Sequence, residues 1–166
     1  PSVKDENHAL VSFEAEITRF PYRLKGLVQE LRELGVHHIG VWHGIMGYRG
    51  GIHPQLAKKY ELPPDSLGRY FLGYDLGKTF EFFYDFYGYL REQGVTFIKV
   101  GDQGSPKSFC RSGMDPTGLY KNLQIAMQAA ASIQFNSAHF NAECMNNENL
   151  YYWGTSSIAR VAEDIK

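Results

Sequence analysis

Residues 96–103 have the sequence Thr-Phe-Ile-Lys-Val-Gly-Asp-Gln. The apolar residues around a single lysine predict a buried strand, and the glycine after them predicts where that strand ends. A lysine in such a run is costly to bury unless it meets an acceptor, and ligands of parallel-stranded α/β folds bind just beyond the carboxyl ends of the strands. Lys99 and Asp102 are therefore our first candidate site residues. The spacing leaves open the alternative of a strand end followed by a solvated turn.

Helix and strand patterns alternate on both sides of this stretch. Apolar residues recur at helical spacing after Pro21 and after Asp75, which is a good N-cap, and Gly35 and Gly94 are good stops for these two helices. The predicted helices are 24–34, 75–94 and 119–134, and the predicted strands are 36–42, 95–100, 138–145 and 157–161. Residues 11–13 are either a short strand or the exit of one. Strands that alternate with helices favour a parallel α/β sheet or barrel.

The loop lengths favour the barrel. Long loops follow the predicted strands and short loops follow the helices, as in a TIM barrel with its active site on the strand-to-helix loops. A full barrel needs about 200 residues or more, whereas this chain has 166. We therefore predict one partial (β/α)8 TIM-barrel domain over residues 1–166, roughly the central half of a catalytic barrel. Its two open sheet edges favour a homo-oligomer.

The composition excludes several classes of partner. The net charge of −1 gives no electrostatic footprint for nucleic acid or an anionic membrane, and no apolar run reaches the length of a membrane span. Cys110 and Cys144 form neither a metal-type spacing nor a disulfide framework. No signal peptide is visible, so we expect a cytoplasmic protein. As a separate expectation, no metal or organic cofactor is implied. The aromatic content of 14% suits either a large core or sugar stacking.

Polar side chains lie at the end of each predicted strand. They are Trp42 and His43, then Lys99 and Asp102, then Glu143 and Cys144, and finally Arg160 and Asp164. On parallel strands these tips would converge on one edge of the sheet. Two carboxylates with nearby cations and an aromatic wall are typical of glycoside chemistry, in which one carboxylate attacks or stabilises and the other protonates the leaving oxygen.

Several short segments carry a more specific signal. They are Ser-Phe-Glu-Ala at 12–15, Arg-Phe-Pro at 19–21, Val-Trp-His-Gly at 41–44, Gly-Tyr-Arg-Gly-Gly at 47–51, Ile-Lys-Val-Gly-Asp-Gln at 98–103, Cys-Met at 144–145 and Ser-Ile-Ala-Arg-Val-Ala-Glu-Asp-Ile at 157–165. In this order they resemble the raffinose synthase, alkaline α-galactosidase and seed-imbibition group of glycoside hydrolase family 36. That group has Val-Trp-His-Ala, Gly-Tyr-Trp-Gly-Gly and Val-Lys-Val-Asp-Asn-Gln at the corresponding places.

The resemblance implies a (β/α)8 catalytic barrel with retaining chemistry on α-galactosides, by hydrolysis or by galactosyl transfer. Carried over by position, it implies Lys99 as the sugar-binding lysine, Cys144 as a pocket residue, Arg160 as a contact to sugar or carboxylate, Asp164 as the general acid/base, and Trp42 and His43 as lining of the galactose pocket. Relative to the family, this sequence lacks the preceding Asp-Asp-Gly-Trp strand, the later barrel strands and the flanking β-sandwich.

The departures from the family pattern concern the nucleophile. Its position falls on Gly101, and the next residue is Asp102. A shift of one residue along a strand turns a side chain to the opposite face, so Asp102 replaces the nucleophile only if the strand has already ended. Arg49 replaces a family tryptophan, and Glu143 replaces an asparagine. The alternative hypothesis is a non-catalytic carbohydrate-binding or assembly module derived from the barrel.

Overall fold

The structure, a computed structural model, describes residues 2–110, 115–136, 139–141 and 151–159, with side chains left out at 139–141 and 159. It is a mixed α/β fold with two sheets. None of the described helices combines the length and the apolar composition needed to cross a membrane.

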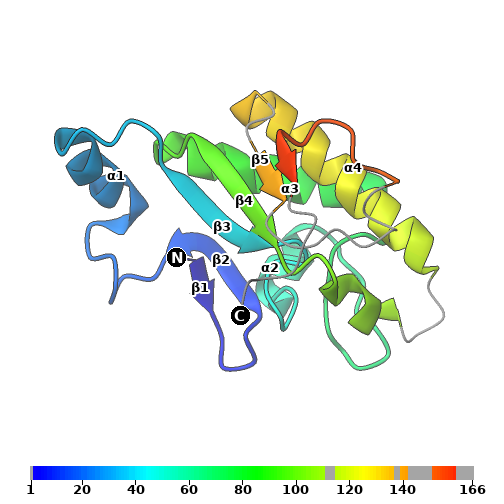
Figure 1. Cartoon of the computed structure of the whole chain (residues 1–166). Coiled ribbons are helices and arrows are strands. Elements are labelled where there is room, and N and C mark those ends of the chain that lie inside the picture. The colour runs from blue at the N-terminus through cyan, green and yellow to red at the C-terminus, as the bar shows by residue number, and fades with distance from the viewer. Residues whose placement is uncertain (1, 111–114, 137–138, 142–150, 160–166) are drawn as a thin grey trace, which may run out of the picture.

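The main sheet has four parallel strands in sequence order. They are β3 (Gly40–Gly44), β4 (Phe97–Gly101), β5 (His139–Asn141) and β6 (Ile158–Ala159). A second, antiparallel hairpin consists of β1 (Ser2–Lys4) and β2 (Leu10–Ala15). Figure 1 shows this hairpin below the main sheet, near the ends of β3 and β4.

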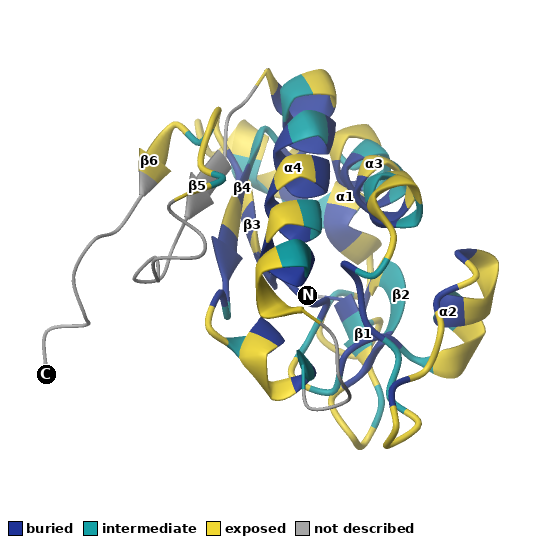
Figure 2. Cartoon of the chain, turned by 90° about the vertical axis from the view of Figure 1, so that its right-hand side faces the viewer, coloured by how far each residue is buried: buried dark blue, intermediate teal, exposed yellow. Residues whose placement is uncertain are grey.

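Helices connect the strands of the main sheet. The described helices are α1 (Arg23–Glu33), α2 (Pro54–Lys59), α3 (Leu76–Glu92), the short 3-10 helix η1 (Ser105–Ser108) and α4 (Pro116–Phe135). The longest two, α3 and α4, join β3 to β4 and β4 to β5. They pack against each other and lie on the same side of the sheet (Figure 2).

Capping residues fix where α3 and α4 begin. The Asp75 carboxylate accepts a hydrogen bond from the backbone N–H of Lys78, and the Asp115 carboxylate accepts from Thr117 and Gly118. These bonds satisfy N–H groups that have no partner within the helix.

The hydrophobic core fills the space between the sheet and the helices α3 and α4. Val41 and Ile98 point into it from the sheet, and Phe83, Phe86 and Leu90 meet them from α3. Side chains alternate between the two faces of a strand, so the residues between the core positions lie on the opposite face. No helix among the described residues covers that opposite face, which we call the open face (Figure 2).

The predicted α/β class and the three long helices are confirmed. The turns at Gly35 and Gly94 have φ of +86° and +91°, as expected for glycines that end helices. Several details differ from the prediction. The strand predicted over residues 36–42 lies at Gly40–Gly44, and residues 11–13 belong to a strand of the separate hairpin. Residues 54–59 form a short helix inside what was predicted as a loop, because Pro54 at its first turn and the His53 side chain cap it.

Candidate functional site

Trp42 and Lys99 lie side by side on the open face. They are register partners on β3 and β4, so both side chains leave the sheet in the same direction. The Trp42 side chain is 38% exposed, and Lys99 is exposed as well. The sequence placed both residues at the tips of parallel strands, and the sheet register is what brings them together.

Gly101 makes room for the indole ring of Trp42. A Cβ atom built on Gly101 would lie 2.5 Å from Nε1 and 2.7 Å from Cζ2 of Trp42, which is closer than real Cβ atoms approach other atoms. The ring therefore rests directly against the backbone of β4, a close approach that only glycine permits. The absence of a side chain at position 101 is therefore needed for this position of the Trp42 ring, because any residue larger than glycine there requires Trp42 to move.

Asp102 lies just past the end of β4, which the structure ends at Gly101. Its φ of +55° is in the left-handed region, which aspartate adopts more readily than most residues. Ser105 fixes this turn, because its backbone N–H and its hydroxyl donate hydrogen bonds of 3.0 and 2.6 Å to the Asp102 carbonyl oxygen. The strand has thus ended where the sequence argument required it to end.

The turn directs the Asp102 carboxylate toward the end of β3. A Cβ on Gly44 would lie 2.9 Å from Oδ2 of Asp102, so the carboxylate is packed close to the backbone of that residue. Gly44 is the register partner of Gly101. Two glycines at the tips of adjacent strands therefore accommodate one indole ring and one carboxylate.

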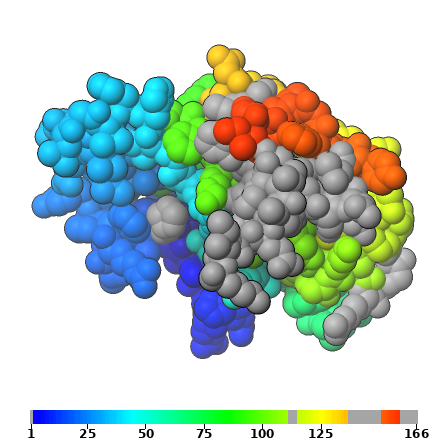
Figure 3. Space-filling model, viewed as in Figure 1, coloured from blue at the N-terminus to red at the C-terminus, as the bar shows by residue number. Residues whose placement is uncertain are grey.

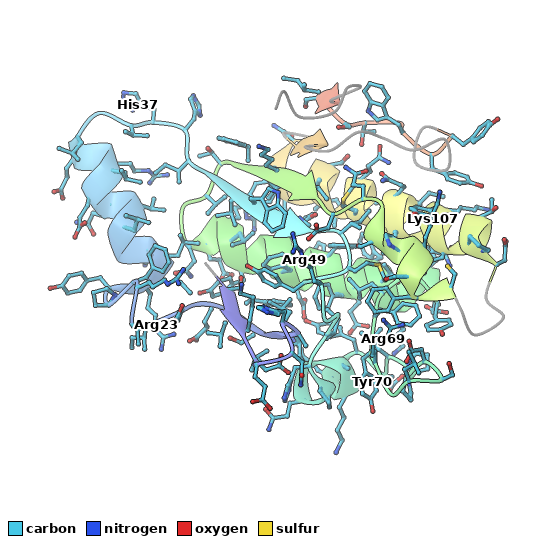
Figure 4. The ribbon with its side chains drawn as sticks, turned by 60° about the horizontal axis from the view of Figure 1, so that its bottom comes forward. Arg23, His37, Arg49, Arg69, Tyr70 and Lys107 are labelled. Atoms are coloured by element: carbon cyan, nitrogen blue, oxygen red, sulfur yellow. The ribbon has the colours of Figure 1, made fainter. Side chains whose placement is uncertain are left out.

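A cavity of about 290 Å³ lies at these strand tips. Its lining consists of Trp42 and Asp102 together with Lys4, His8, Tyr48 and Arg49. The rings of Trp42 and Tyr48 are 6.4 Å apart and tilted by 58°, so they form two adjoining walls. Figure 4 shows Arg49 beside the tips of β3 and β4. Aromatic walls with a few polar groups are typical of ligand sites.

Backbone hydrogen bonds place the hairpin residues at this cavity. The Gly50 N–H donates to the carbonyl oxygen of His8 over 3.0 Å, and the Leu10 N–H donates to that of Gly51 over 2.9 Å. Gly50 also allows close contact, because a Cβ there would lie 2.7 Å from the carbonyl carbon of His8. The β1–β2 hairpin, a projection at the lower edge in Figure 3, is thereby tied to the loop that follows β3.

The electrostatics of the cavity involve Tyr48, Lys4 and Asp102. Burial raises the pKa of the Tyr48 phenol above its ordinary value, and the negative charge of Asp102 raises it further. The Lys4 ammonium lies over the Tyr48 ring, with Nζ 4.7 Å from the ring centroid. Such a position is a cation–π contact. Tyr48 therefore stays protonated at neutral pH and offers a hydroxyl group to a ligand.

The prediction that His43 lines a pocket with Trp42 is corrected by the structure. His43 is only 3% exposed and lies on the covered face, where its ring packs against Phe86 and Tyr87. Its Nδ1 lies 2.9 Å from the Gly44 carbonyl oxygen and its Nε2 lies 2.9 Å from the Tyr87 hydroxyl. Since a carbonyl only accepts, we assign the proton to Nδ1, and Tyr87 then donates to Nε2. Consecutive residues of a strand point to opposite faces, so His43 is a core residue.

The remaining predicted site residues lie outside the described side chains. These are Cys144, Arg160 and Asp164, together with Glu143. Sequence reasoning in turn gave no role to Lys4, His8 or Tyr48. Tyr48 stood within a segment that resembles the family, which was a usable signal. Lys4 and His8 come from a hairpin distant in sequence, and no local pattern marks them.

Comparisons with known proteins assign no family to this chain. No protein-family model matches it, and a search of curated proteins finds no match. Within the described part of the chain, no three His, Cys, Asp or Glu side chains gather as a metal site would require.

Proposed function

We propose that this chain is a glycoside hydrolase-like domain that binds the galactosyl unit of α-galactosides in the cavity at the tips of β3 and β4. The observation that carries the proposal is the pairing of the Trp42 ring with the Asp102 carboxylate across two glycines. The apolar face of a sugar stacks on aromatic rings, and its hydroxyls donate to carboxylates. Tyr48 and Lys99 add further hydrogen-bonding groups at or beside the cavity.

The arrangement of the sheet supports a partial (β/α)8 barrel as the scaffold. Four parallel strands follow one another in sequence order, and α3 and α4 cover the same face. In a closed barrel of this type the helices lie outside, and the carboxyl ends of the strands carry the active site. The open face would then be the inside of the barrel, and Asp102 lies at the carboxyl end of its strand.

The proposed reaction is a retaining galactosyl transfer to water or to a second sugar. A carboxylate oxygen of Asp102 forms a bond to the anomeric carbon while the glycosidic bond breaks, and the leaving oxygen takes a proton from Asp164. Asp164 then removes a proton from the acceptor, water or a second sugar. The acceptor oxygen bonds to the anomeric carbon and displaces the carboxylate of Asp102. This scheme needs two carboxyl groups about 5–5.5 Å apart. The role of Asp164 rests on the sequence resemblance.

A second candidate, sugar binding without turnover, is favoured by the environment of Gly101. The Trp42 ring occupies the space into which an aspartate at that position would project. In this alternative Asp102 accepts hydrogen bonds from sugar hydroxyls and does not attack the anomeric carbon. The two candidates share one binding site and differ only in whether a covalent intermediate forms.

The first test is calorimetric titration with methyl α-galactoside. We expect saturable binding, abolished by Trp42→Ala and kept by Trp153→Ala. Trp153 is a matched control because it is 39% exposed, close to the 38% of Trp42, and does not line the cavity. Absence of binding to the folded chain, or equal losses in the two variants, would overturn the proposal.

The second test separates catalysis from binding. If Asp102 is the nucleophile, the intact chain hydrolyses an aryl α-galactoside and the Asp102→Ala variant does not. Azide added to this variant should then restore release of the aryl group, with β-galactosyl azide as the product. Azide fills the space of the missing carboxylate and attacks from the same side, so the anomeric configuration of the azide reports the role of Asp102. Binding without hydrolysis by the intact chain would select the non-catalytic alternative.

A further inference from the structure

We propose that the sugar bound at this site carries an anionic substituent, a carboxylate or a phosphate or sulfate ester, which Lys4 and Arg49 recognise. The inference rests on the proposed function, because it specifies the ligand of the same cavity. A neutral galactoside would leave two cationic groups on the cavity wall without a ligand partner.

Cations outnumber anions in the cavity lining. Lys4 and Arg49 carry two positive charges, whereas Asp102 carries one negative charge. His8 adds a third basic side chain, and Lys99 stands next to Trp42 on the open face. The whole chain has a net charge of −1, so this is a local excess of positive charge. Such an excess attracts an anionic ligand and strengthens its hydrogen bonds.

Neither Lys4 nor Arg49 forms an ion pair within the described residues. Arg19, Arg23 and Arg69, by contrast, each pair with a carboxylate three to nine positions away in the sequence. Both cavity cations are exposed and within reach of a ligand. The protein therefore does not neutralise these two charges itself, although it neutralises several others.

The support of Lys4 and His8 is ordered. In the β1–β2 turn, Oδ1 of Asp5 accepts hydrogen bonds from the N–H groups of Asn7 and Ala9 over 3.0 and 2.8 Å. The His8 N–H donates to the Asp5 carbonyl oxygen over 3.1 Å, and the His8 carbonyl accepts from Gly50. Lys4 itself is placed over the Tyr48 ring. A group that is already held in position loses less entropy when it binds a ligand.

The position of the cations relative to Asp102 suggests how an anionic sugar would be oriented. Asp102 lies at the tips of the main-sheet strands, where a neighbouring anion would be repelled and a sugar hydroxyl could donate to the carboxylate. Lys4 comes from the hairpin and Arg49 from the loop after β3, so they form the part of the lining that does not belong to the strand tips. The anionic substituent would contact these two residues while the hydroxyls face Asp102.

The test compares sugars that differ only in charge. Calorimetric titrations of the intact chain would use galactose, galacturonic acid and galactose 6-phosphate at low salt, with inorganic phosphate as a fourth ligand. We expect at least one anionic sugar to bind about tenfold more tightly than galactose, with a preference that weakens as salt is added. Whether galacturonic acid or the phosphate ester binds more tightly identifies the substituent.

Two variants and a control test the residues. Lys4→Gln and Arg49→Gln should each weaken the binding of the preferred anionic sugar roughly three- to tenfold, and weaken it more than they weaken the binding of galactose. Lys121→Gln is the control, because Lys121 is an exposed lysine on α4 and does not line the cavity.

The outcomes separate this inference from the proposed function. Galactose that binds at least as tightly as both anionic sugars would overturn the inference and leave the proposed function standing. Inorganic phosphate that binds as tightly as galactose 6-phosphate would also overturn the inference, because the cations would then bind an anion without recognising the sugar. If no sugar binds, the proposed function itself fails.

Discussion

The two faces of β3 and β4 differ although the same two strands build both. On the face covered by α3 and α4, Ile98 and Val100 are fully buried, and the one polar side chain, His43, has hydrogen-bond partners for both ring nitrogens. On the open face, Trp42 and Lys99 are exposed. The comparison shows that alternate residues of one strand can meet two environments, because one face packs in the core and the other stays exposed, where we propose that a ligand binds.

The largest expected effect compares two neighbouring residues of β4. Ile98→Ala should lower the free energy of unfolding by about 2–5 kcal/mol, because it removes a fully buried side chain and leaves a cavity. Lys99→Ala should change it by less than about 0.5 kcal/mol. Urea unfolding of both variants checks this difference. Equal losses would mean that the two faces are equally packed.

The next largest effect concerns the hydroxyl group that reaches His43. Tyr87→Phe should cost about 1–3 kcal/mol, because it leaves Nε2 of a buried imidazole without its donor. Tyr84→Phe on the same helix is the matched control, since Tyr84 is exposed and should lose almost nothing. Thermal unfolding of the two variants measures the difference. A Tyr87→Phe variant as stable as the control would show that the bond to His43 contributes little.

A smaller effect is expected where the Trp42 ring meets Gly101. Gly101→Ala should cost about 1 kcal/mol, the low end for overpacking, because the half-exposed ring can swing outward. The fluorescence of Trp42 should then shift toward that of a solvated indole, measured with Trp153 replaced by Phe. Gly104→Ala is the control, because a Cβ there meets no atom within 4 Å. An unchanged spectrum in Gly101→Ala would contradict the close contact.

The smallest effect compares tyrosines on the two faces. Asp102→Asn should lower the pKa of Tyr48, because one of the two causes that raise it is removed, while the pKa of Tyr87, which burial alone raises, should not change. Spectrophotometric titration of tyrosinate, with Tyr48→Phe to identify the signal, checks this. A pKa of Tyr48 that does not move would place Asp102 too far away to share a site with it.

These raised pKa values also set the alkaline limit of stability. A tyrosine whose pKa is higher in the folded state releases its proton more easily when unfolded. Its contribution to stability is therefore complete below the unfolded pKa of about 10 and is lost as the pH rises from there toward the folded pKa. Tyr87, which is fully buried, should contribute most to this loss.

Trp42 and Asp102 are the two cavity residues that sequence patterns predicted as site residues, and the misplacement of His43 followed from neglecting one such pattern. Lys99 and Asp102 were selected from a strand that ends in glycine, and the structure places the turn there. His43 was predicted beside Trp42 although adjacent residues of a strand face opposite ways. The alternation was visible in the sequence, and applying it would have placed His43 in the core.

Other features had no local signal. The cavity wall formed by Lys4 and His8 depends on a hairpin that docks onto residues 48–53 through backbone hydrogen bonds. Backbone groups are the same in every residue, so the sequence does not reveal which segments they will join. The contact of the Trp42 ring with Gly101 likewise depends on the register of two strands separated by a loop and two helices.

The sequence by itself determined the local elements of this protein. Caps, helix stops and the alternation along each strand act between residues a few positions apart, so α3, α4 and the covered face of β4 could be predicted from it. Only the tertiary structure decided that an indole ring, a carboxylate and two cations line one cavity. Those contacts join residues far apart in the chain, and their geometry is set by how the sheet, the hairpin and the loop after β3 pack together.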